Sequence, residues 1–555
     1  MSRKGITLIC LTAVIALVLV ACQAAPTATP ATQPTAPPLS LPTPTLVPAA
    51  PTAAPAAQAT TVPAAPTRPA ATPTAASKSK GKMVLAITAE PPNFLPEQFN
   101  DINAMYIGWN IVERLTERDS KTFETKGQLA EKWQQVDPKT LRITLRKGVK
   151  YHNGNPFGAA DVQYTIQRDI QPDSQILRYI PNVTEAKVVD DSTVDIILKD
   201  PDPIMATRLY YVPIVNAKFG KESPERLPIE PIGTGPYKFV EWVRGQFIRL
   251  TVNEAYWGPA PAVKDATYVF RSESSVRAAM VRTGEAQFAV AISPEDAKNV
   301  PKLATGPSNE TMMLRLDTQT HDALKDKRVR KAVALAIDKE TLTKTLYAGY
   351  ATVAPGQMYP PFTIGFDASL KAYPFDKDGA KKLIAEAKAA GVNVDAEMAI
   401  TAPKGRWIRD AELTEALVNM LKDVGLNAKV NIVEYSKWRE WLYSAGPGQP
   451  HNAILLSGHS QDLGDASLSY DSYVVTGGRM SYFSNAEFDK LEKAGSQAGG
   501  QDRITNFQKA TAIAYDEVPI VPMIYLNQIH GMAKNLNWSP RTDVMLLLNE
   551  FIWTD

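Results

Sequence analysis

Cysteine is nearly absent from this chain of 555 residues, and its two examples, Cys10 and Cys22, lie within the first 22 positions. The rest of the sequence therefore contains no thiol. This excludes an internal disulfide framework, a thiolate metal site and a cysteine nucleophile from the part of the chain that follows.

Histidine is also scarce, with five residues that never form a His-x-His or His-x-x-x-His pair. A metal centre built from the chain alone is not expected. The sequence also lacks the Gly-x-Ser-x-Gly elbow, the phosphate loop and the Gly-x-Gly-x-x-Gly turn. We therefore expect no cofactor and no enzymatic activity.

Neither sign of charge is in large excess. The formal net charge is +2, with acidic and basic residues interspersed. A nucleic-acid-binding protein would be expected to show a basic stripe, so no nucleic-acid partner is predicted.

The first 22 residues have the pattern of a secretory signal. Arg3 and Lys4 precede an apolar run over residues 6–21, which is short for a permanent membrane span. No later apolar run approaches 18 residues, so no further membrane helix is expected. We interpret residues 1–22 as a signal peptide.

The end of this run, Leu19-Val20-Ala21-Cys22, resembles the lipobox of bacterial lipoproteins. The resemblance implies cleavage before Cys22 and acylation of that residue. Two or three acyl chains anchor a protein stably, whereas one gives marginal binding. We therefore expect an extracytoplasmic protein, periplasmic or at the cell surface, held to the membrane through Cys22.

Residues 23–80 form a segment of unusual composition. Fourteen of the 43 prolines lie there among Ala and Thr, and the only charged residues are Arg68, Lys78 and Lys80. Too few large apolar side chains are present to offset the entropy of folding. The segment is predicted to be a disordered tether, either presenting the folded part to a partner or simply crossing a surface layer.

The remaining residues, from about position 82 to 555, are too many for one hydrophobic core and predict at least two lobes. In the first half, strands are predicted at 83–88, 141–145 and 193–198, with a hairpin at 237–243 and 247–252. Helices are expected at 104–115 and from 158 to 166. This half is predicted to be an α/β or α+β lobe.

Helices dominate the second half, at 328–337, from Asp338, at 377–390, and at 410–424 before Gly425. Strand-like runs at 398–401, 428–433 and 453–456 lie between them. An order of strand, helix and strand predicts a second α/β lobe. Because no flexible linker follows Lys82, we expect short crossing segments between the lobes.

Several separated segments resemble one family. They are Gly127-Gln-Leu-Ala-Glu-Lys-Trp133, Leu141-Arg-Ile-Thr-Leu-Arg-Lys-Gly-Val-Lys-Tyr-His-Asn-Gly154 with Ala160-Asp161-Val162, Gly233-Thr-Gly-Pro-Tyr237 with Asn253 and Tyr256-Trp257, Asp326-Lys-Arg-Val-Arg330 through Asp338, and Val518-Pro-Ile-Val-Pro522. In this order they are similar to the oligopeptide, dipeptide and nickel solute-binding proteins of ABC importers, family 5. The resemblance covers nearly all of residues 82–555.

This resemblance implies an α/β, two-lobed fold of the type II periplasmic-binding-protein kind, with a ligand cleft between the lobes. Carried over, lobe I is 82–315 with a return segment at 519–555, and lobe II is 316–518. Hinge closure around a ligand would shift the population to the closed state. The implied partners are an ABC permease and its ATPase, and we expect a monomer.

The resemblance also points to one ligand loop, Gly458-His-Ser-Gln-Asp-Leu-Gly-Asp465. In peptide-binding members the corresponding loop reads roughly Gly-Trp-x-x-Asp-Tyr-Pro-Asp-Pro, and its first aspartate pairs with the α-ammonium of the peptide. Asp462 has that position, with His459 and Gln461 beside it. His459 replaces the aromatic residue and Leu463-Gly464 replace Tyr-Pro, so a solvated loop residue remains the alternative for Asp462.

Further ligand contacts are predicted by position in the family. Arg406 could bind a carboxylate and Trp407 could cover an apolar or sugar face, although a surface arginine and a packing tryptophan are equally compatible. Phe94, Tyr106 and Trp109 are candidates on the first lobe. Trp133 and Trp257 are expected in the core instead.

The leading hypothesis is a receptor that delivers di- or oligopeptides to an importer. A receptor for another small solute, such as an oligosaccharide, opine or metal chelate, is the alternative within the binding class. A tethered secreted hydrolase and a signalling receptor without transport are the alternatives outside it.

Overall fold

The structure is a computed structural model and describes residues 81–99, 101–443 and 453–554. The predicted signal, the tether at 23–80 and the lipidation site Cys22 lie outside the described residues. Among the residues it does describe, no helix combines the length and the apolar character needed to cross a membrane.

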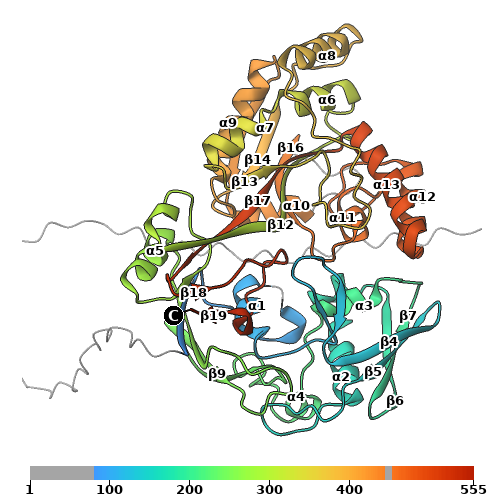
Figure 1. Cartoon of the computed structure of the whole chain (residues 1–555). Helices are drawn as coiled ribbons and strands as arrows, with labels where there is room; N and C mark the ends of the chain where they lie inside the picture. The colour runs from blue at the N-terminus through green and yellow to red at the C-terminus, as the bar shows by residue number, and fades with distance from the viewer. Residues whose placement is uncertain (1–80, 100, 444–452, 555) are drawn as a thin grey trace, which may run out of the picture. The chain divides into compact units, whose positions relative to one another are not determined.

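Strands and helices alternate along the described chain. The strands are β1 (Lys82–Ile87), β2 (Thr116–Arg118), β3 (Thr125–Gly127), β4 (Ala130–Asp137), β5 (Thr140–Leu145), β6 (Val183–Asp190), β7 (Thr193–Leu198), β8 (Tyr237–Val243), β9 (Phe247–Val252), β10 (Asp265–Phe270), β11 (Phe288–Ala289), β12 (Lys302–Leu316), β13 (Ala351–Val353), β14 (Met398–Pro403), β15 (Ala428–Val433), β16 (Ile454–Ser460), β17 (Ile520–Met532), β18 (Leu536–Asn537) and β19 (Ile552–Trp553). Figure 1 shows their course.

The helices are α1 (Ile102–Gly108), α2 (Ala159–Asp169), α3 (Met205–Arg208), α4 (Ala217–Glu222), α5 (Ser274–Thr283), α6 (Lys327–Ala336), α7 (Lys339–Thr341), α8 (Lys377–Ala389), α9 (Asp410–Asp423), α10 (Tyr435–Tyr443), α11 (Ala466–Tyr473), α12 (Ala486–Gln497) and α13 (Gly500–Glu517). Short 3-10 turns lie between some of them, including η2 (Ile176–Arg178). Asp or Asn side chains accept the free amides at the start of α1, α4, α6, α7, α8, α11 and α12.

Two long strands, β12 and β17, run through the centre of the largest sheet. They pair antiparallel, first over 302–307 and again over 311–315, with irregular register between Pro307 and Thr311. β16, β14 and β15 continue the sheet beyond β12, and β11, β1, β10, β9 and β8 continue it beyond β17. Thus the pair β12 and β17 joins the two halves of the sheet.

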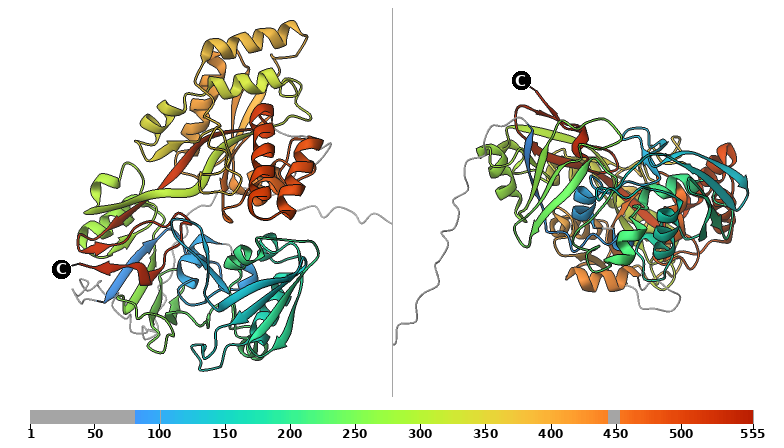
Figure 2. Two further views of the ribbon diagram at one scale, coloured as in Figure 1. Left: turned by 45° about the vertical axis from the view of Figure 1, so that its right-hand side comes forward. Right: turned by 90° about the horizontal axis from the view of Figure 1, so that it is seen from below.

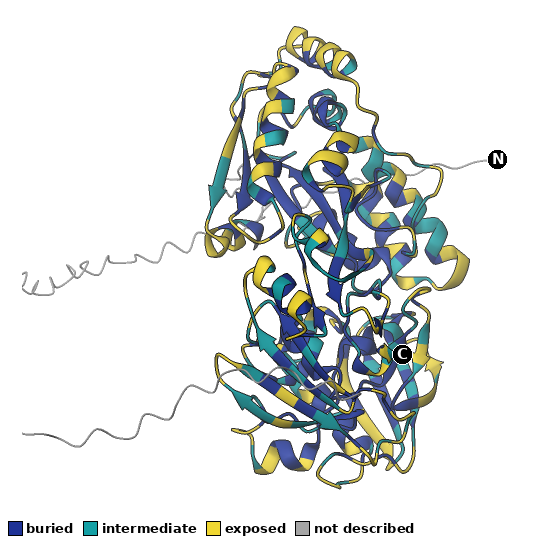
Figure 3. Cartoon of the chain, turned by 60° about the vertical axis from the view of Figure 1, so that its left-hand side comes forward, coloured by how far each residue is buried: buried dark blue, intermediate teal, exposed yellow. Residues whose placement is uncertain are grey.

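The buried apolar side chains form two large clusters. The first, here called the first core, comprises residues within 83–304 and 532–551 together with Leu463 and Leu468. The second core comprises residues within 312–456 and 518–524 together with Tyr482. Figure 3 shows the buried residues in the interior, on strands and on the inner sides of helices.

Around the second core, parallel pairing of β14 with β15 and with β16 forms the sheet. α9 contacts β14 and β15, and α6 packs on α8 and α9 (Figure 1). A smaller cluster with Phe488 and Phe507 lies under α11, α12 and α13, and the last two helices lie side by side (Figure 2). The prediction of alternating strands and helices in this half agrees with these elements.

The first core is flanked by a separate antiparallel sheet in the order β4, β5, β7, β6. Along β5, buried side chains alternate with half-buried ones, as the sequence Leu-Arg-Ile-Thr-Leu predicts. α2 packs against β6 and β7. The carboxylate of Asp161 accepts the amides of Gly158 and Ala217 at 3.0 and 2.7 Å, which fixes the start of α2 against α4.

The predicted helix at 104–115 is too long, since α1 ends at Gly108. Beyond it, the carbonyls of Asn110 and Ile111 accept the amides of Tyr237 and Gly235 at 3.0 and 2.9 Å. A side chain at Gly235 would collide with these carbonyls. Tertiary pairing with the glycine turn therefore replaces the helical hydrogen bonds.

The expectation that Trp257 is a core residue is also wrong. Its side chain remains 37% exposed. The indole Nε1 donates to Glu113 Oε2 at 2.8 Å, and the guanidinium of Arg146 lies 4.3 Å from the ring centre. Trp257 thus anchors its loop to a buried carboxylate from the molecular surface.

Candidate functional site

The loop between β16 and α11, predicted to bind the ligand, is firmly held at its C-terminal end. The carboxylate of Asp465 caps α11 by accepting the amide of Ser467 at 3.0 Å. It also forms a bidentate ion pair with Arg503, at 2.7 and 2.6 Å, and both side chains are buried. Since Gly464 has a positive φ of 65°, the turn before the cap requires a residue that tolerates this conformation.

Asp462 lies at the tip of this loop and contacts residues of the first core. Its Oδ2 is 2.8 Å from Nη2 of Arg178 and accepts the phenol hydroxyl of Tyr179 at 3.0 Å. Its Oδ1 accepts the side-chain amide of Asn309, in β12, at 3.3 Å. The carboxylate therefore has a cation and two neutral donors around it.

The backbone of Asp462 is bound as well. Its carbonyl oxygen accepts the hydroxyl of Tyr211 at 2.9 Å and a guanidinium hydrogen of Arg118. The rings of Tyr179 and Tyr211 stack with centres 4.1 Å apart and planes 7° apart. The stacking holds the two rings side by side, so that both hydroxyls donate to Asp462.

Burial dominates the electrostatics of this contact. The side chain of Asp462 is 15% exposed, while that of Arg178 is 46% exposed. Burial raises the pKa of the Asp462 carboxyl, and the positive charge of Arg178 opposes that rise. An anion in this position needs a nearby cation, which Arg178 supplies.

Other contacts link residues before position 316 to residues after it. Leu463 is buried in the first core, and the ring of Phe123 stacks on that of Phe362 at 4.0 Å. Arg409, at the start of α9, forms an ion pair with Glu295. The loop after β16 thus makes one of several contacts between residues far apart in the sequence.

The structure places Arg406 and Trp407 differently from each other. Arg406 is exposed and lies over the neighbouring Trp407 ring at 5.2 Å. Trp407 is buried, and its Nε1 donates to Oε1 of Glu310 at 2.7 Å. The carboxylate of Asp410 accepts the amides of Arg406 and Trp407 at 2.7 and 3.1 Å, so this loop has a fixed shape.

His459 and Gln461 face α11 and not the residues that surround Asp462. Both side chains are buried and lie 2.7 Å from the hydroxyl oxygen of Ser469. Burial lowers the pKa of His459 to about 3, so its ring is neutral at physiological pH. Their assignment as ligand contacts stays a prediction.

The three predicted contacts of the first lobe belong to its packing. Phe94 is buried edge-on against Trp242, with ring centres 5.3 Å apart. Trp109 is buried edge-on against Tyr210 at 4.8 Å, and Tyr106 is half-buried and packs against the same core. Their role in binding likewise stays a prediction.

Arg118, Arg178, Tyr179 and Tyr211 were not predicted from the sequence, although they make the contact with Asp462. Arg118 lies in β2, Arg178 ends η2 with Tyr179 directly after it, and Tyr211 lies in another 3-10 turn; none of these short elements has a recognisable motif. Only the occurrence of an arginine beside a tyrosine, at positions 178 and 179, could have suggested a polar aromatic surface.

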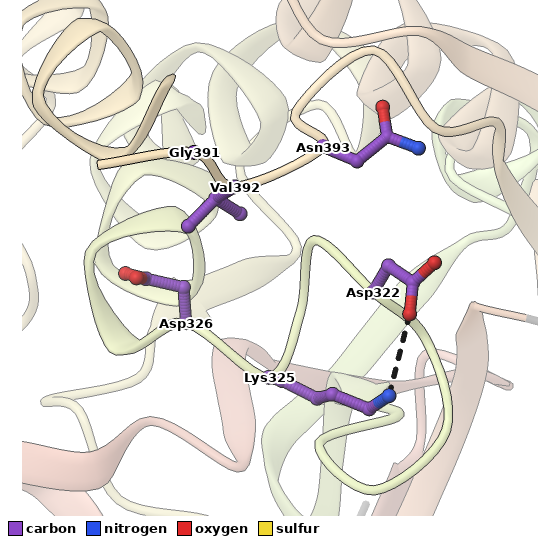
Figure 4. Close-up of a pocket in the computed structure, with 6 residues that line it drawn as sticks. All are labelled: Asp322, Lys325, Asp326, Gly391, Val392 and Asn393. Atoms are coloured by element: carbon purple, nitrogen blue, oxygen red, sulfur yellow. Dashed lines mark hydrogen bonds and ion pairs between the residues drawn. The ribbon is translucent and has the colours of Figure 1, made fainter. Parts of the chain in front are cut away.

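A shallow pocket of about 490 Å³ lies elsewhere, lined by Asp322, Lys325, Asp326 and residues 391–393 (Figure 4). Its charged residues already have partners, with Lys325 3.3 Å from Asp322 and Asp326 bound to the neighbouring Arg328. We do not assign it a ligand. In the described ranges, no three His, Cys, Asp or Glu residues are grouped as metal ligands.

The fold is that of type II periplasmic binding proteins, because several solved structures of that class superpose on most of the chain. ABC transporter substrate binding protein CtaP from Listeria monocytogenes matches with a TM-score of 0.76 and 20% identity, covering 86% of this chain and 100% of CtaP. The oligopeptide-binding protein AppA from Bacillus subtilis, in complex with a nonapeptide, gives 0.70 and 21%, covering 86% and 99%.

The sequence matches the family of bacterial extracellular solute-binding proteins, family 5 Middle, over residues 124–480. The chain belongs to this family, as the resemblance of its motifs predicted. It is also 27% identical over 476 residues to the glutathione-binding protein GsiB of Salmonella choleraesuis (strain SC-B67), covering 82% of this chain and 91% of GsiB. These relatives are binding proteins and not enzymes.

Proposed function

We propose that this chain is the extracytoplasmic solute receptor of an ABC importer and captures a peptide or peptide-sized solute without altering it. The contact at Asp462 is the single observation that carries the proposal. There a carboxylate from the loop after β16 meets Arg178, Tyr179 and Tyr211 of the first core. A solute held beside these groups would contact both cores at once.

In this proposal, the first and second cores are the centres of lobe I (82–315 and 519–555) and lobe II (316–518). β12 and β17 act as the hinge, and the irregular register between Pro307 and Thr311 gives them a place to bend. Binding energy from both lobes favours the closed state, which the permease would recognise.

The same proposal includes the membrane anchor. Acylation of Cys22 would fix the chain to the membrane, and residues 23–80 would allow the receptor to reach the permease. The protein would act as a monomer, and the permease would work with an ATPase subunit. The catalytic machinery for a hydrolase has no support in the described contacts around Asp462.

A receptor for a different small solute is a second candidate, and one observation favours it. The carboxylate expected to bind the α-ammonium of a peptide already pairs with Arg178 at 2.8 Å. A solute without that ammonium, such as an opine, a sugar or a metal chelate, would not compete with this pair.

The test is a thermal-shift screen of the full chain, purified in detergent, against peptides, oligosaccharides, opines and chelates. A ligand that binds only the native state raises the melting temperature, by an amount set by its concentration relative to Kd. We expect peptide-like solutes to stabilise the protein and to be recovered unchanged. Stabilisation by sugars or chelates alone would select the second candidate, and recovery of cleaved solute would refute both.

A further inference from the structure

We infer that Arg178 is a specificity-determining residue that excludes a free α-ammonium from the position facing Asp462. The solute would therefore be one that has no free amine there, such as an N-acylated peptide. This inference rests on the proposed function, because it names the solute class of that same site.

The first step of the argument is the occupancy of the carboxylate. Oδ2 of Asp462 already accepts from Arg178 and Tyr179, and Oδ1 accepts from Asn309. A carboxylate has about four acceptor positions, so an incoming ammonium would either use the one left on Oδ1, beside the donors already bound, or displace one of them. The only one of the three that carries a positive charge is Arg178.

The second step concerns charge. Adding an ammonium beside Arg178 would place two cations against one carboxylate that is only 15% exposed, and partial burial makes an unmatched charge costly. The other arginine of the contact, Arg118, adds further positive charge, because it donates to the backbone oxygen of the same residue. A solute with an acylated, neutral nitrogen avoids this repulsion.

The third step is that Arg178 is held in place. Its guanidinium carbon lies 4.6 Å from the ring centre of Tyr179, and that ring is itself stacked on Tyr211. A cation over a tyrosine ring and bonded to a carboxylate has two independent restraints. Arg178 therefore has a fixed place beside Asp462, and its removal should leave room there for another cation.

The first experiment uses methylammonium as a probe and requires no knowledge of the solute. Melting temperatures of the full chain and of Arg178→Ala are compared in methylammonium chloride and in sodium chloride of equal concentration. We expect methylammonium to raise the melting temperature of Arg178→Ala and not of the wild type. The rise should vanish in Arg178→Ala/Asp462→Asn, which lacks the carboxylate.

An equal response of wild type and Arg178→Ala to methylammonium, or a rise that persists in the double variant, would overturn the inference. The single variant Asp462→Asn serves as a folding control. It keeps the donors around residue 462 and loses only the negative charge.

The second experiment compares short peptides as matched pairs with a free or an N-acetylated amino terminus. The wild type should bind the acetylated form at least as tightly, and Arg178→Ala should favour the free amine by about tenfold, the strength of one charge-assisted hydrogen bond. A wild type that prefers the free amine, with the preference lost in Asp462→Asn, would overturn the inference. If no peptide of either form binds any variant, peptide capture fails, while the methylammonium result still decides the role of Arg178.

Discussion

Replacing Arg503 by leucine tests how the loop that carries Asp462 is held. Arg503 comes from α13, is 3% exposed at its side chain and bonds Asp465 through Nε and Nη2. It also donates to the carbonyls of Gly495 and Ser496, both at 2.9 Å. The leucine side chain replaces none of these donors.

The expected loss is large because one partner of a buried pair is removed while the other stays. Asp465 would remain as a buried carboxylate without its cation, and such changes cost about 3–5 kcal/mol. The capping bond from the Ser467 amide to Asp465 is unaffected, so the loss should not include a helix cap. Asp465→Asn/Arg503→Leu should recover part of the stability, since a neutral amide is cheaper to bury.

The assay is denaturant unfolding of the purified protein, followed by tryptophan fluorescence. Arg226→Leu is the matched control, because its ion pair with Glu230 is exposed on both sides, and we expect an unchanged unfolding midpoint. If Arg503→Leu also left the midpoint unchanged, or if the double variant were the least stable of the set, the reasoning about the buried pair would be refuted.

Three further predictions use other contacts. Arg315 is buried and, within the described residues, forms no ion pair with a carboxylate, but its guanidinium donates to the carbonyl oxygen of Met480. Arg315→Met removes a buried charge and one hydrogen bond together, so the free energy of unfolding should change by less than about 1 kcal/mol, and a loss above about 3 kcal/mol would contradict this. Gly464→Ala and Gly391→Ala should each lower the free energy of unfolding by about 1–2 kcal/mol, because alanine is strained at a positive φ. A methyl group at 464 would also lie 3.0 Å from the Phe123 ring and should weaken stabilisation by the ligand, whereas nothing lies near position 391. Burial raises the pKa of Glu492 from 4.5 to about 8, and repulsion by Asp471 adds to this rise. The protonated carboxyl therefore contributes fully to the free energy of unfolding below pH 4.5, and this contribution is lost as the pH rises towards 8. Melting temperatures measured over that pH range should fall less in Glu492→Gln than in the wild type. An equal fall in both proteins would contradict the assignment.

Much of the fold could be predicted because local signals and tertiary packing agree. The alternating residues of β5, the hairpin of β8 and β9, and the Asp338 cap of α7 are all visible in short stretches of sequence. The prediction of a helix over 104–115 was wrong because residues 110 and 111 hydrogen-bond to the turn around Gly235, more than a hundred residues later in the sequence. Periodicity does not reveal such a partner.

The candidate site was only partly predictable for the same reason. The family resemblance indicated Asp462, but its contacts Arg178 and Tyr179 lie 284 and 283 residues away. His459 and Gln461 were predicted beside it because they are neighbours in the sequence. In a strand, neighbouring side chains point to opposite faces, and these two bond Ser469 of α11 instead.

The central claim is that this protein binds a solute at the contact between Asp462 and the first core and releases it unchanged. The most direct measurement is equilibrium dialysis of the full chain with a peptide and N-acylpeptide library, followed by mass spectrometry of the retained and released compounds. We predict saturable retention of compounds whose masses are unaltered, weakened by Gly464→Ala and not by Gly391→Ala. Release of cleaved products, or retention that is identical in both variants and does not saturate, would contradict the account.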